Sequence, residues 1–345
     1  MPGGSLPLAV TMGDPAGVGP VITWKAYESF RARSRRFFVI ADPRVLNAIR
    51  PAGSPNYPIK LIASPDEAAS AFEEGLPVMP ITCPVPKPGE PDPASATAVL
   101  DSIRLAVMQV QSGKAAAVVT NPIAKALLYR AGFKHPGHTE FLAELAAKDG
   151  VAPRPVMMLV GGGLRVALCT IHRPLSTVPT ALSADLIADV GRITDAAMKQ
   201  DFGFANPRLG LCGVNPHAGE DGEIGREEIE YVNPAAQRLR DAGISCSNAR
   251  PGDTIFREAL DGRFDAVIAM FHDQGLIPVK TLDMWGGVNV TLGLPFIRTS
   301  PDHGVAYDAA ASGKARPDSL IAALDLAGQM AVARASAKAG QKVAK

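Results

Sequence analysis

The sequence has few aromatic residues and no excess of charge of either sign. Aromatic residues make up 6% of the 345 residues and charged residues 20%. Lysine and arginine number 35 against 34 aspartate and glutamate, and a net charge of +1 excludes the basic profile typical of nucleic-acid or anionic-membrane binding. A core with so few aromatics must consist mostly of Ala, Val, Leu and Ile, which suits helices packed on a parallel sheet.

Cysteine is also scarce, and no C-x-x-C pair occurs. The four cysteines are far apart in the sequence, which favours thiols in a reducing cytoplasm over a disulfide framework: Cys83, Cys169, Cys212 and Cys246. The stretch Met1–Gly19 lacks a basic region and is interrupted by Gly and Pro, so we expect no signal peptide. No apolar run approaches the length of a membrane span, so we expect no membrane segment.

Glycine and proline are plentiful, at 33 and 30 residues, and they follow short apolar runs. These runs alternate with amphipathic segments, a pattern that predicts an α/β fold with a largely parallel sheet. The predicted strands are Leu6–Met12, Phe37–Ile40, Ala115–Thr120, Val166–Ile171, Leu209–Val214 and Asp265–Phe271. The predicted helices are Ser95–Gln111, Ser183–Lys199 and Gly225–Asp241, with Ser95 and Ser183 as N-caps.

Three of the six histidines stand at or shortly after the ends of predicted strands. His172 follows Val166–Ile171, His272 follows Asp265–Phe271, and His217 stands three residues beyond Leu209–Val214. The carboxyl ends of parallel strands share one edge of a sheet, so the three imidazoles can converge. Neutral imidazoles suit Zn²⁺ or another borderline divalent ion. Each histidine alone is better explained as a turn or capping residue, but three at equivalent strand ends favour a metal site.

Other strand ends carry groups suited to an anion. The turn Gly13–Pro20 precedes a helix but matches neither G-x-G-x-x-G nor a P-loop, so it is either an anion site or a tight turn. His138 and Thr139 stand at the start of a predicted helix, where they can bind phosphate or carboxylate, although an N-cap alone explains Thr139. Further along the chain, an anion pocket or plain surface charge explains Lys280, Asn289 and Arg298.

The sequence resembles the 4-hydroxythreonine-4-phosphate dehydrogenases of vitamin B6 biosynthesis. The matching strings run in family order from near the N-terminus to beyond residue 300, and the last of them is highly specific. They are GDPAGVGP at Gly13–Pro20, PGHTEF at Pro136–Phe141, NPHAG at Asn215–Gly219, HDQG at His272–Gly275 and GVNVTLGLPFIRTSPDHG at Gly287–Gly304.

This resemblance implies a two-domain fold related to the isocitrate and isopropylmalate dehydrogenases, with the active site in an interdomain cleft and a homodimer as the working form. We expect residues 1–131 plus 285–345 on the nucleotide side and 132–284 on the metal-ligand and dimerisation side. The implied metal ligands are His172, His217 and His272, and the implied substrate contacts are His138, Thr139, Lys280, Asn289 and Arg298.

The resemblance also implies a nicotinamide nucleotide, NAD or NADP, along Ser300–Ala315, with His303, Gly304 and Asp308 as its contacts. A divalent ion, Zn²⁺, Mg²⁺ or Co²⁺, lowers the pKa of the substrate hydroxyl. Lys280 or Asp253 carries protons.

The implied reaction is oxidation of 4-phosphohydroxy-L-threonine to 2-amino-3-oxo-4-(phosphooxy)butanoate, which loses CO₂ to give 3-amino-2-oxopropyl phosphate. One alternative is a paralogue acting on phosphorylated threonate or erythronate, or on a cis-dihydrodiol carboxylate. Outside the family, a three-histidine zinc hydrolase and a non-catalytic metal- or phosphate-binding module remain as alternatives.

Overall fold

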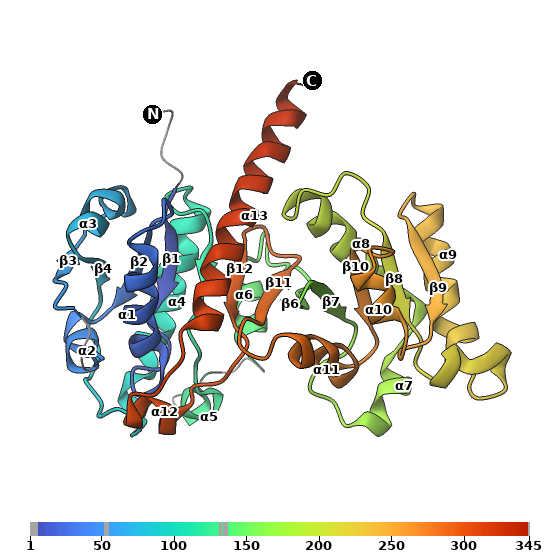
Figure 1. Ribbon diagram of the computed structural model, residues 1–345, viewed down its shortest axis with the longest axis horizontal. Helices are drawn as coiled ribbons and strands as arrows, with labels where there is room; N and C mark the ends of the chain where they lie inside the picture. The colour runs from blue at the N-terminus through green and yellow to red at the C-terminus, as the bar shows by residue number, and fades with distance from the viewer. Residues whose placement is uncertain (1–5, 52–54, 131–132, 134–136, 344–345) are drawn as a thin grey trace. The chain divides into compact units, whose positions relative to one another are not determined.

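The computed structural model describes residues 6–51, 55–130, 133 and 137–343 (Figure 1). The chain divides into two compact units that alternate along the sequence. The first comprises Met1–Pro153 and Leu294–Ala331, and the second Arg154–Gly293 and Val332–Lys345. The domain boundary expected at residues 131–132 lies outside the described residues, and the domain limits stay a prediction.

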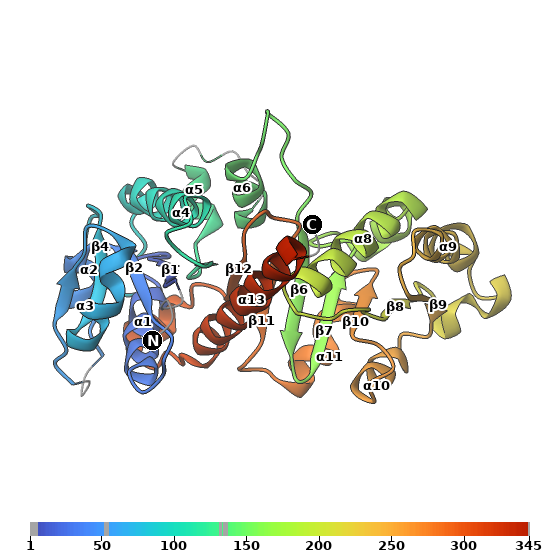
Figure 2. The same ribbon diagram turned by 90° about the horizontal axis from the view of Figure 1, so that it is seen from above.

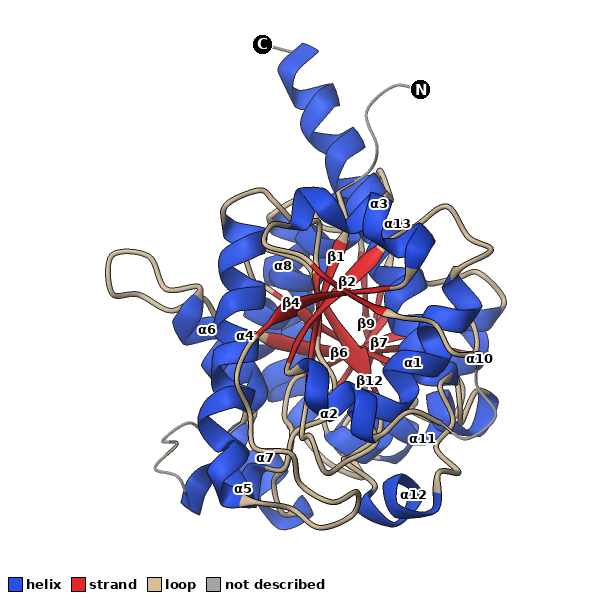
Figure 3. Cartoon of the chain, turned by 90° about the vertical axis from the view of Figure 1, so that its left-hand side faces the viewer, coloured by secondary structure: helices blue, strands red, loops and turns tan. Residues whose placement is uncertain are grey.

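In the first unit every pair of neighbouring strands is parallel. Their order is β3-β4-β2-β1-β5-β12, and Leu8 lies opposite Phe37 while Val10 lies opposite Val119. Almost all residues of β1, β2 and β4 are buried because helices cover both faces, as Figure 3 shows. The strands are β1 (Leu8–Thr11), β2 (Phe37–Ala41), β3 (Ile59–Leu61), β4 (Leu76–Pro80), β5 (Val118–Val119) and β12 (Arg298–Pro301).

The helices of this unit lie on both faces of its strands, with α4 on one side and α1 and α13 on the other (Figure 2). Ser95 stands at the N-cap position of α4, as predicted, but its side chain makes no capping hydrogen bond there. It ends a short 3₁₀ turn, in which the N–H of Ala94 donates to the side chain of Asp92. The helices are α1 (Gly19–Phe30), α2 (Pro43–Ala48), α3 (Ala68–Glu74), α4 (Ala96–Gln111), α5 (Lys125–Arg130), α6 (His138–Leu145), α12 (Tyr307–Ser312) and α13 (Asp318–Val343), which extends into the second unit.

The second unit combines a parallel part with an antiparallel part. Its strand order is β11-β6-β7-β10-β8-β9, in which β11–β6 and β6–β7 are antiparallel and the other pairs parallel. A two-glycine turn, Gly162-Gly163 with φ of 58° and 86°, joins β6 to β7. The strands are β6 (Val156–Gly161), β7 (Leu164–Leu168), β8 (Leu209–Cys212), β9 (Cys246–Arg250), β10 (Ala266–Ala269) and β11 (Val288–Leu292). The predicted α/β fold with a mostly parallel sheet is confirmed.

In this unit α8 and α9 lie on one side of the strands and α10 and α11 on the other (Figure 2). Ser183 is the N-cap of α8, as predicted, and its hydroxyl accepts a 3.1 Å hydrogen bond from the N–H of Leu186. The helical segments are α7 (Val178–Ala181), α8 (Ala184–Gln200), η4 (Pro216–Gly222), the π-helical turn η5 (Glu228–Val232), α9 (Asn233–Asp241), α10 (Ile255–Leu260) and α11 (His272–Leu282).

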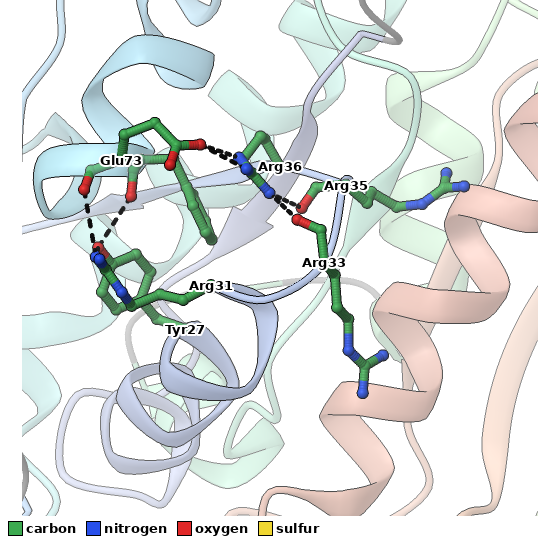
Figure 4. A network of polar contacts seen from close by, with 7 residues as sticks. Tyr27, Arg31, Arg33, Arg35, Arg36 and Glu73 are labelled. Carbon is green, nitrogen blue, oxygen red and sulfur yellow. Dashed lines mark hydrogen bonds and ion pairs between the residues drawn. The ribbon is translucent and has the colours of Figure 1, made fainter.

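A run of arginines after α1 packs within the first unit. Arg31 donates a 2.9 Å hydrogen bond to the hydroxyl of Tyr27, and Arg36 donates a 3.0 Å bond through Nε to the Glu73 carboxylate (Figure 4). The guanidinium of Arg36 also lies over the ring of Phe72. These two arginines therefore join the end of α1 to α3.

The other two arginines of the run face α13. Arg33 forms an ion pair with Asp325, and Arg35 lies against Gly328, where its guanidinium fills the space that a Cβ would occupy. Because all four guanidinium groups have such contacts, the run acts as a packing element between α1, α3 and α13.

Helix α13 is, in the described part of the chain, the one helix long and apolar enough to cross a membrane by length and composition. The sequence does not predict a helix of this length and hydropathy, because it contains no apolar run that approaches the length of a membrane span. The 23-residue segment has a mean hydropathy of 1.2, and core helices of soluble proteins pass the same test. Leu320, Ala323, Leu324 and Ala327 on its first turns are fully buried, as expected of a helix that packs on a core.

Candidate active site

The carboxyl ends of four strands in the second unit carry the residues singled out in the sequence. Strand β10 pairs in parallel with β7 on one side and with β8 on the other, and β8 pairs with β9. His172 follows β7, His272 follows β10, His217 follows β8 and Asp253 follows β9. The strand arrangement thus places all four residues after the carboxyl ends of the parallel strands, which the sequence predicts for the three histidines and not for Asp253.

Two of the three histidines lie side by side. The ring centroids of His172 and His272 are 5.4 Å apart, with the rings inclined by 41°. His272 is the first residue of α11, and its Nδ1 lies 3.0 Å from Oδ1 of Asp273. A proton shared between these two atoms leaves the lone pair of Nε2 available to a metal ion. The pair therefore fits a divalent ion as two of its ligands.

His217 stands on an unusual turn. His217, Ala218, Gly219, Glu220 and Asp221 all have positive φ, between 44° and 81°. Such a left-handed conformation costs roughly 1–2 kcal/mol for each residue with a side chain. Among the described residues no three His, Cys, Asp or Glu side chains are grouped closely enough to hold a metal ion. The structure therefore does not bring His217 to the other two histidines, and the full ligand set stays a prediction.

A buried carboxylate that no sequence pattern singles out lies beneath this turn. Glu228 is 2% exposed, and its Oε1 accepts hydrogen bonds from the backbone N–H groups of Val214 (2.7 Å) and Asn215 (2.8 Å). Its Oε2 accepts a 2.9 Å bond from the side-chain amide of Asn215. In sequence Glu228 is one of several acids in a helical stretch, and nothing local distinguishes it from Glu227 or Glu230.

Gln274 joins two of the strand ends. Its side-chain nitrogen donates a 2.7 Å bond to the carbonyl of Gly213 after β8, and its oxygen accepts a 2.8 Å bond from the N–H of Met270 after β10. The glutamine of the HDQG string therefore links the ends of β8 and β10 by hydrogen bonds, two residues after His272.

Three further predicted site residues belong to the second unit: Asp253, Lys280 and Asn289. Asp253 is exposed after β9, Lys280 is half-buried in the second half of α11, and Asn289 lies on β11 opposite Leu159. Oδ1 of Asn289 is buried without a hydrogen-bond partner among the described residues. A buried acceptor of this kind is suited to a ligand that brings a donor.

The first unit contains a group of polar side chains with two cations among them, which we call the Arg298 cluster: Thr120, Lys125, His138 and Arg298. Arg298, on β12, is 4% exposed and donates to the hydroxyl of Thr120 through Nε (3.1 Å) and Nη2 (2.7 Å). Burial lowers the pKa of Arg298 to about 10. An arginine remains cationic at pH 7 under such conditions, so a positive charge is held in a largely dehydrated place.

His138, the first residue of α6, lies within the field of two cations. Burial, and then the charges of Arg298 and Lys125, hold the pKa of His138 well below its ordinary value of 6.5. Its Nε2 is buried without a hydrogen-bond partner among the described residues. A methyl group at Gly137 would lie 3.2 Å from Nζ of Lys125 and 2.7 Å from Oε2 of Glu140, so both charged groups gather over the start of α6.

The structure thus brings His138 together with Arg298, as the resemblance implies, and Thr139 follows as the second residue of α6. In the sequence Lys125 stands out only as a polar residue after a strand. His135 and Pro136 of the same motif lie outside the described residues. The cluster can bind an anion, because two cations and a helix N-terminus meet around a neutral imidazole.

The segment expected to hold the nucleotide lies against the glycine-rich turn after β1. The N–H of Val18 donates a 2.9 Å bond to the carbonyl of Val305, and the hydroxyl of Tyr307 donates a 2.6 Å bond to Oδ2 of Asp14. His303 is exposed and Asp308 stands in the first turn of α12. Gly304 follows with open space where a Cβ would project. No pattern in the sequence pairs these two segments.

The cysteines do not supply a nucleophile. All four are free, and burial raises the pKa of Cys83 to about 11 and that of Cys169 to about 12. Burial raises the pKa of Cys212 and Cys246 as well. Cys83 and Cys212 are buried and Cys169 and Cys246 partly buried, and thiols with a raised pKa are weak nucleophiles at pH 7 because little thiolate is present.

Residues 33–327 match the family model described as "Pyridoxal phosphate biosynthetic protein PdxA". The chain belongs to the PdxA family. A 4-hydroxythreonine-4-phosphate dehydrogenase of Caulobacter vibrioides is 48% identical over 334 residues, which cover 96% of this chain and 99% of the relative. Another, from Bradyrhizobium diazoefficiens, is 50% identical over 337 residues and covers 95% and 98%.

Solved structures of PdxA-family proteins have the same fold. A 4-hydroxythreonine-4-phosphate dehydrogenase from Klebsiella pneumoniae superimposes with a TM-score of 0.86 at 36% identity, covering 95% of this chain and 100% of that one. A terephthalate 1,2-cis-dihydrodiol dehydrogenase from Burkholderia xenovorans is more distant, with a TM-score of 0.64 at 27% identity and coverage of 94% and 98%. The resemblance noted in the sequence is therefore confirmed, and the relatives are dehydrogenases.

Proposed function

We propose that this PdxA-family dehydrogenase oxidises 4-phosphohydroxy-L-threonine with NAD⁺ or NADP⁺ and a divalent metal ion. The product, 2-amino-3-oxo-4-(phosphooxy)butanoate, loses CO₂ to give 3-amino-2-oxopropyl phosphate for pyridoxine 5′-phosphate biosynthesis. The observation that carries the choice of substrate is the Arg298 cluster. Its buried guanidinium, beside Lys125 and His138, suits a phosphate group.

The substrate-binding residues in this proposal are His138, Thr139, Lys280, Asn289 and Arg298. Arg298 and the start of α6 bind the phosphate. The buried Oδ1 of Asn289 accepts a hydrogen bond from a substrate donor, which relieves an acceptor that would otherwise stay unpaired.

Proton transfer is proposed for Lys280 or Asp253. The reaction releases one proton from the substrate hydroxyl as hydride leaves the neighbouring carbon for the nicotinamide, and it takes up one proton at carbon after CO₂ departs. The ammonium of Lys280 can donate that proton, whereas the exposed carboxylate of Asp253 can accept the hydroxyl proton. The nucleotide is proposed to contact His303, Gly304 and Asp308.

The metal ligands in this proposal are His172, His217 and His272, of which His172 and His272 lie side by side. A bound Zn²⁺, Mg²⁺ or Co²⁺ would lower the pKa of the substrate hydroxyl and act as a Lewis acid during decarboxylation. We also propose a homodimer that works in the cytoplasm, as the family resemblance implies.

The alternative substrates are phosphorylated threonate or erythronate and a cis-dihydrodiol carboxylate. The dihydrodiol alternative is favoured by the Burkholderia xenovorans structure, whose name states such an activity. It is disfavoured by the Arg298 cluster, because a dihydrodiol carboxylate carries no phosphate.

A steady-state assay tests this function. The metal-stripped protein is given 4-phosphohydroxythreonine with NAD⁺ or NADP⁺, and then Zn²⁺, Mg²⁺ or Co²⁺ is added back. We expect nucleotide reduction only after the metal is restored, with CO₂ released. Higher kcat/KM on phosphothreonate, phosphoerythronate or a cis-dihydrodiol carboxylate would contradict the substrate assignment, and activity without nucleotide would contradict the reaction.

A further inference from the structure

The turn that bears His217 is left-handed over five successive residues, and four of these are not glycine. Chains adopt such a conformation only where the surroundings impose it, and it is concentrated at functional sites. Something next to the turn must therefore hold it.

Glu228 lies in position to do so. Its carboxylate accepts three N–H hydrogen bonds, two from the backbone of Val214 and Asn215 and one from the Asn215 side chain. Val214 and Asn215 are the residues that lead from β8 into the turn. Glu228 itself opens the π-helical turn η5, a rare form of helix that is frequent at functional sites.

Two glycines make room for this carboxylate. A Cβ at Gly213 would lie 3.0 Å from Oε1 of Glu228, and a Cβ at Gly219 would lie 2.5 Å from Oε2. Gly219 also has a φ of 81° within the left-handed turn. The carboxylate therefore occupies a space left open by Gly213, which precedes the turn, and by Gly219 at its centre, two residues beyond His217.

We propose that Glu228 is a positioning residue for His217, because its buried carboxylate binds the residues that lead into the left-handed turn and packs against Gly219 at the centre of the turn, and thereby aims the imidazole. The link to metal binding rests on the proposed function, in which His217 is the third ligand. Outer residues that orient a metal ligand typically change metal affinity by about 10–100-fold when they are replaced.

The charge state of the acceptor matters here. A glutamine at 228 keeps the volume but offers an amide N–H where Oε1 or Oε2 now accepts, so at least one of the three donors loses its partner. The neighbour Glu227 provides a matched control, because its Oε2 accepts a 2.7 Å bond from the same Asn215 side chain, which a glutamine oxygen can still accept. The backbone N–H groups of Val214 and Asn215 donate to Glu228 instead.

The test uses full-length protein with ¹⁵N-labelled histidine. The His217 ring signals are assigned with a His217→Gln variant, and Co²⁺ alone is titrated by its visible absorption. In Glu228→Gln we expect the His217 ring signals to shift or broaden and the Co²⁺ dissociation constant to rise roughly 10-fold or more. Glu227→Gln is expected to resemble the unaltered protein in both measurements.

A second variant covers the case in which Glu228→Gln fails to fold. Gly219→Ala places a methyl group against Oε2 without changing any charge, and it is expected to reproduce both effects. Gly243→Ala is its control, since Gly243 has a similar φ of 78° with nothing within 4 Å of its Cβ position.

Unchanged His217 signals in Glu228→Gln and in Gly219→Ala would overturn the proposal. If the unaltered protein binds no Co²⁺, the metal part of the proposed function fails, and the His217 signals alone decide the role of Glu228. Loss of stability with unchanged His217 signals and unchanged Co²⁺ affinity would make Glu228 a structural residue only.

Discussion

The hydroxyl of Tyr307 donates a 2.6 Å hydrogen bond to Oδ2 of Asp14, and so joins two segments 293 residues apart in the sequence. Asp14 is 2% exposed, and its other oxygen accepts a 3.0 Å bond from the N–H of Ala16. The bond fastens the start of α12 to the turn after β1, both of which lie in the first unit.

Replacing Tyr307 by phenylalanine is expected to destabilise the first unit. Asp14 keeps its bond to Ala16 but loses a donor to a buried carboxylate, which lowers the free energy of unfolding by about 1.5–3 kcal/mol. Chemical denaturation measures this loss. The control is Tyr57→Phe, a tyrosine of the same unit whose ring packs against Tyr27, and it is expected to stay within about 0.5 kcal/mol. Equal losses in both variants would contradict the role of the Asp14 bond.

Stability is expected to fall in mild acid because of His138. The folded protein holds the pKa of His138 below the ordinary value of 6.5, so as the pH falls below 6.5 the unfolded chain binds a proton that the folded chain does not. The free energy of unfolding therefore does not depend on this group above pH 6.5 and falls as the pH drops below 6.5. The fall is at most about 1.4 kcal/mol per pH unit for one proton.

Denaturant unfolding between pH 7.5 and 5.5 checks this prediction with His138→Gln. The variant should show a flatter dependence on pH than the unaltered protein. His303→Gln, at an exposed histidine of the same unit, is the control and should leave the slope unchanged. A His138→Gln profile as steep as the original would show that other groups cause the acid sensitivity.

Arg298→Lys is expected to weaken binding of the phosphorylated substrate while leaving the charge in place. The planar guanidinium of Arg298 donates twice to Thr120, and a lysine ammonium cannot reproduce this geometry. We expect the lysine to lose one charge-assisted hydrogen bond to the phosphate, and such a bond is worth about 1.5–3 kcal/mol. The Michaelis constant for the phosphorylated substrate should therefore rise by about 10-fold or more, with a smaller change in kcat. Arg104→Lys, at an exposed arginine paired with Asp101, should change neither constant. An unaltered Michaelis constant in Arg298→Lys would remove Arg298 from the phosphate site.

The left-handed turn after β8 gives a stability test of its own. Glu220 is exposed with a φ of 44°, and glycine adopts that conformation without strain. Glu220→Gly is expected to raise the free energy of unfolding by roughly 0.5–1 kcal/mol, the relief of strain less the greater entropy of the unfolded glycine. Glu223→Gly, three residues on at a φ of −74°, should instead lower it by about 0.5–1 kcal/mol. Losses in both variants would contradict the strain.

The sequence predicts the parts of the fold that repeat a local pattern. The strands before His172, His217 and His272 are where their apolar runs place them, because buried parallel strands are nearly continuous in hydrophobic residues. Ser183 caps α8 through its side chain as predicted, whereas Ser95 holds the N-cap position of α4 without a side-chain bond and Asp92 caps the 3₁₀ turn before it. A cap depends on which of two competing polar residues lies first, and periodicity does not decide that.

The site is less accessible from sequence, because its main contacts join distant segments. The motifs name His138 and Arg298, yet the burial of His138 and the nearby charge of Arg298 on β12, which together lower the pKa of His138, exist only in the folded chain. The left-handed backbone at His217 and the buried Glu228 beneath it have no signature in residue type. Both result from tertiary packing around two glycines, which no pattern of hydrophobic residues records.

The alternation of the two units along the chain has a consequence for synthesis on the ribosome. The first unit begins with Met1–Pro153 but is completed by Leu294–Ala331, so β5 emerges with one edge unpaired and waits for β12. About 140 residues must be added in between, which takes roughly 7–30 s at ordinary rates of translation. During that interval the edge of β5 is open to mispairing, a hazard that nascent-chain chaperones relieve. The Arg298 cluster therefore cannot form before β12 has been synthesised, late in the growth of the chain.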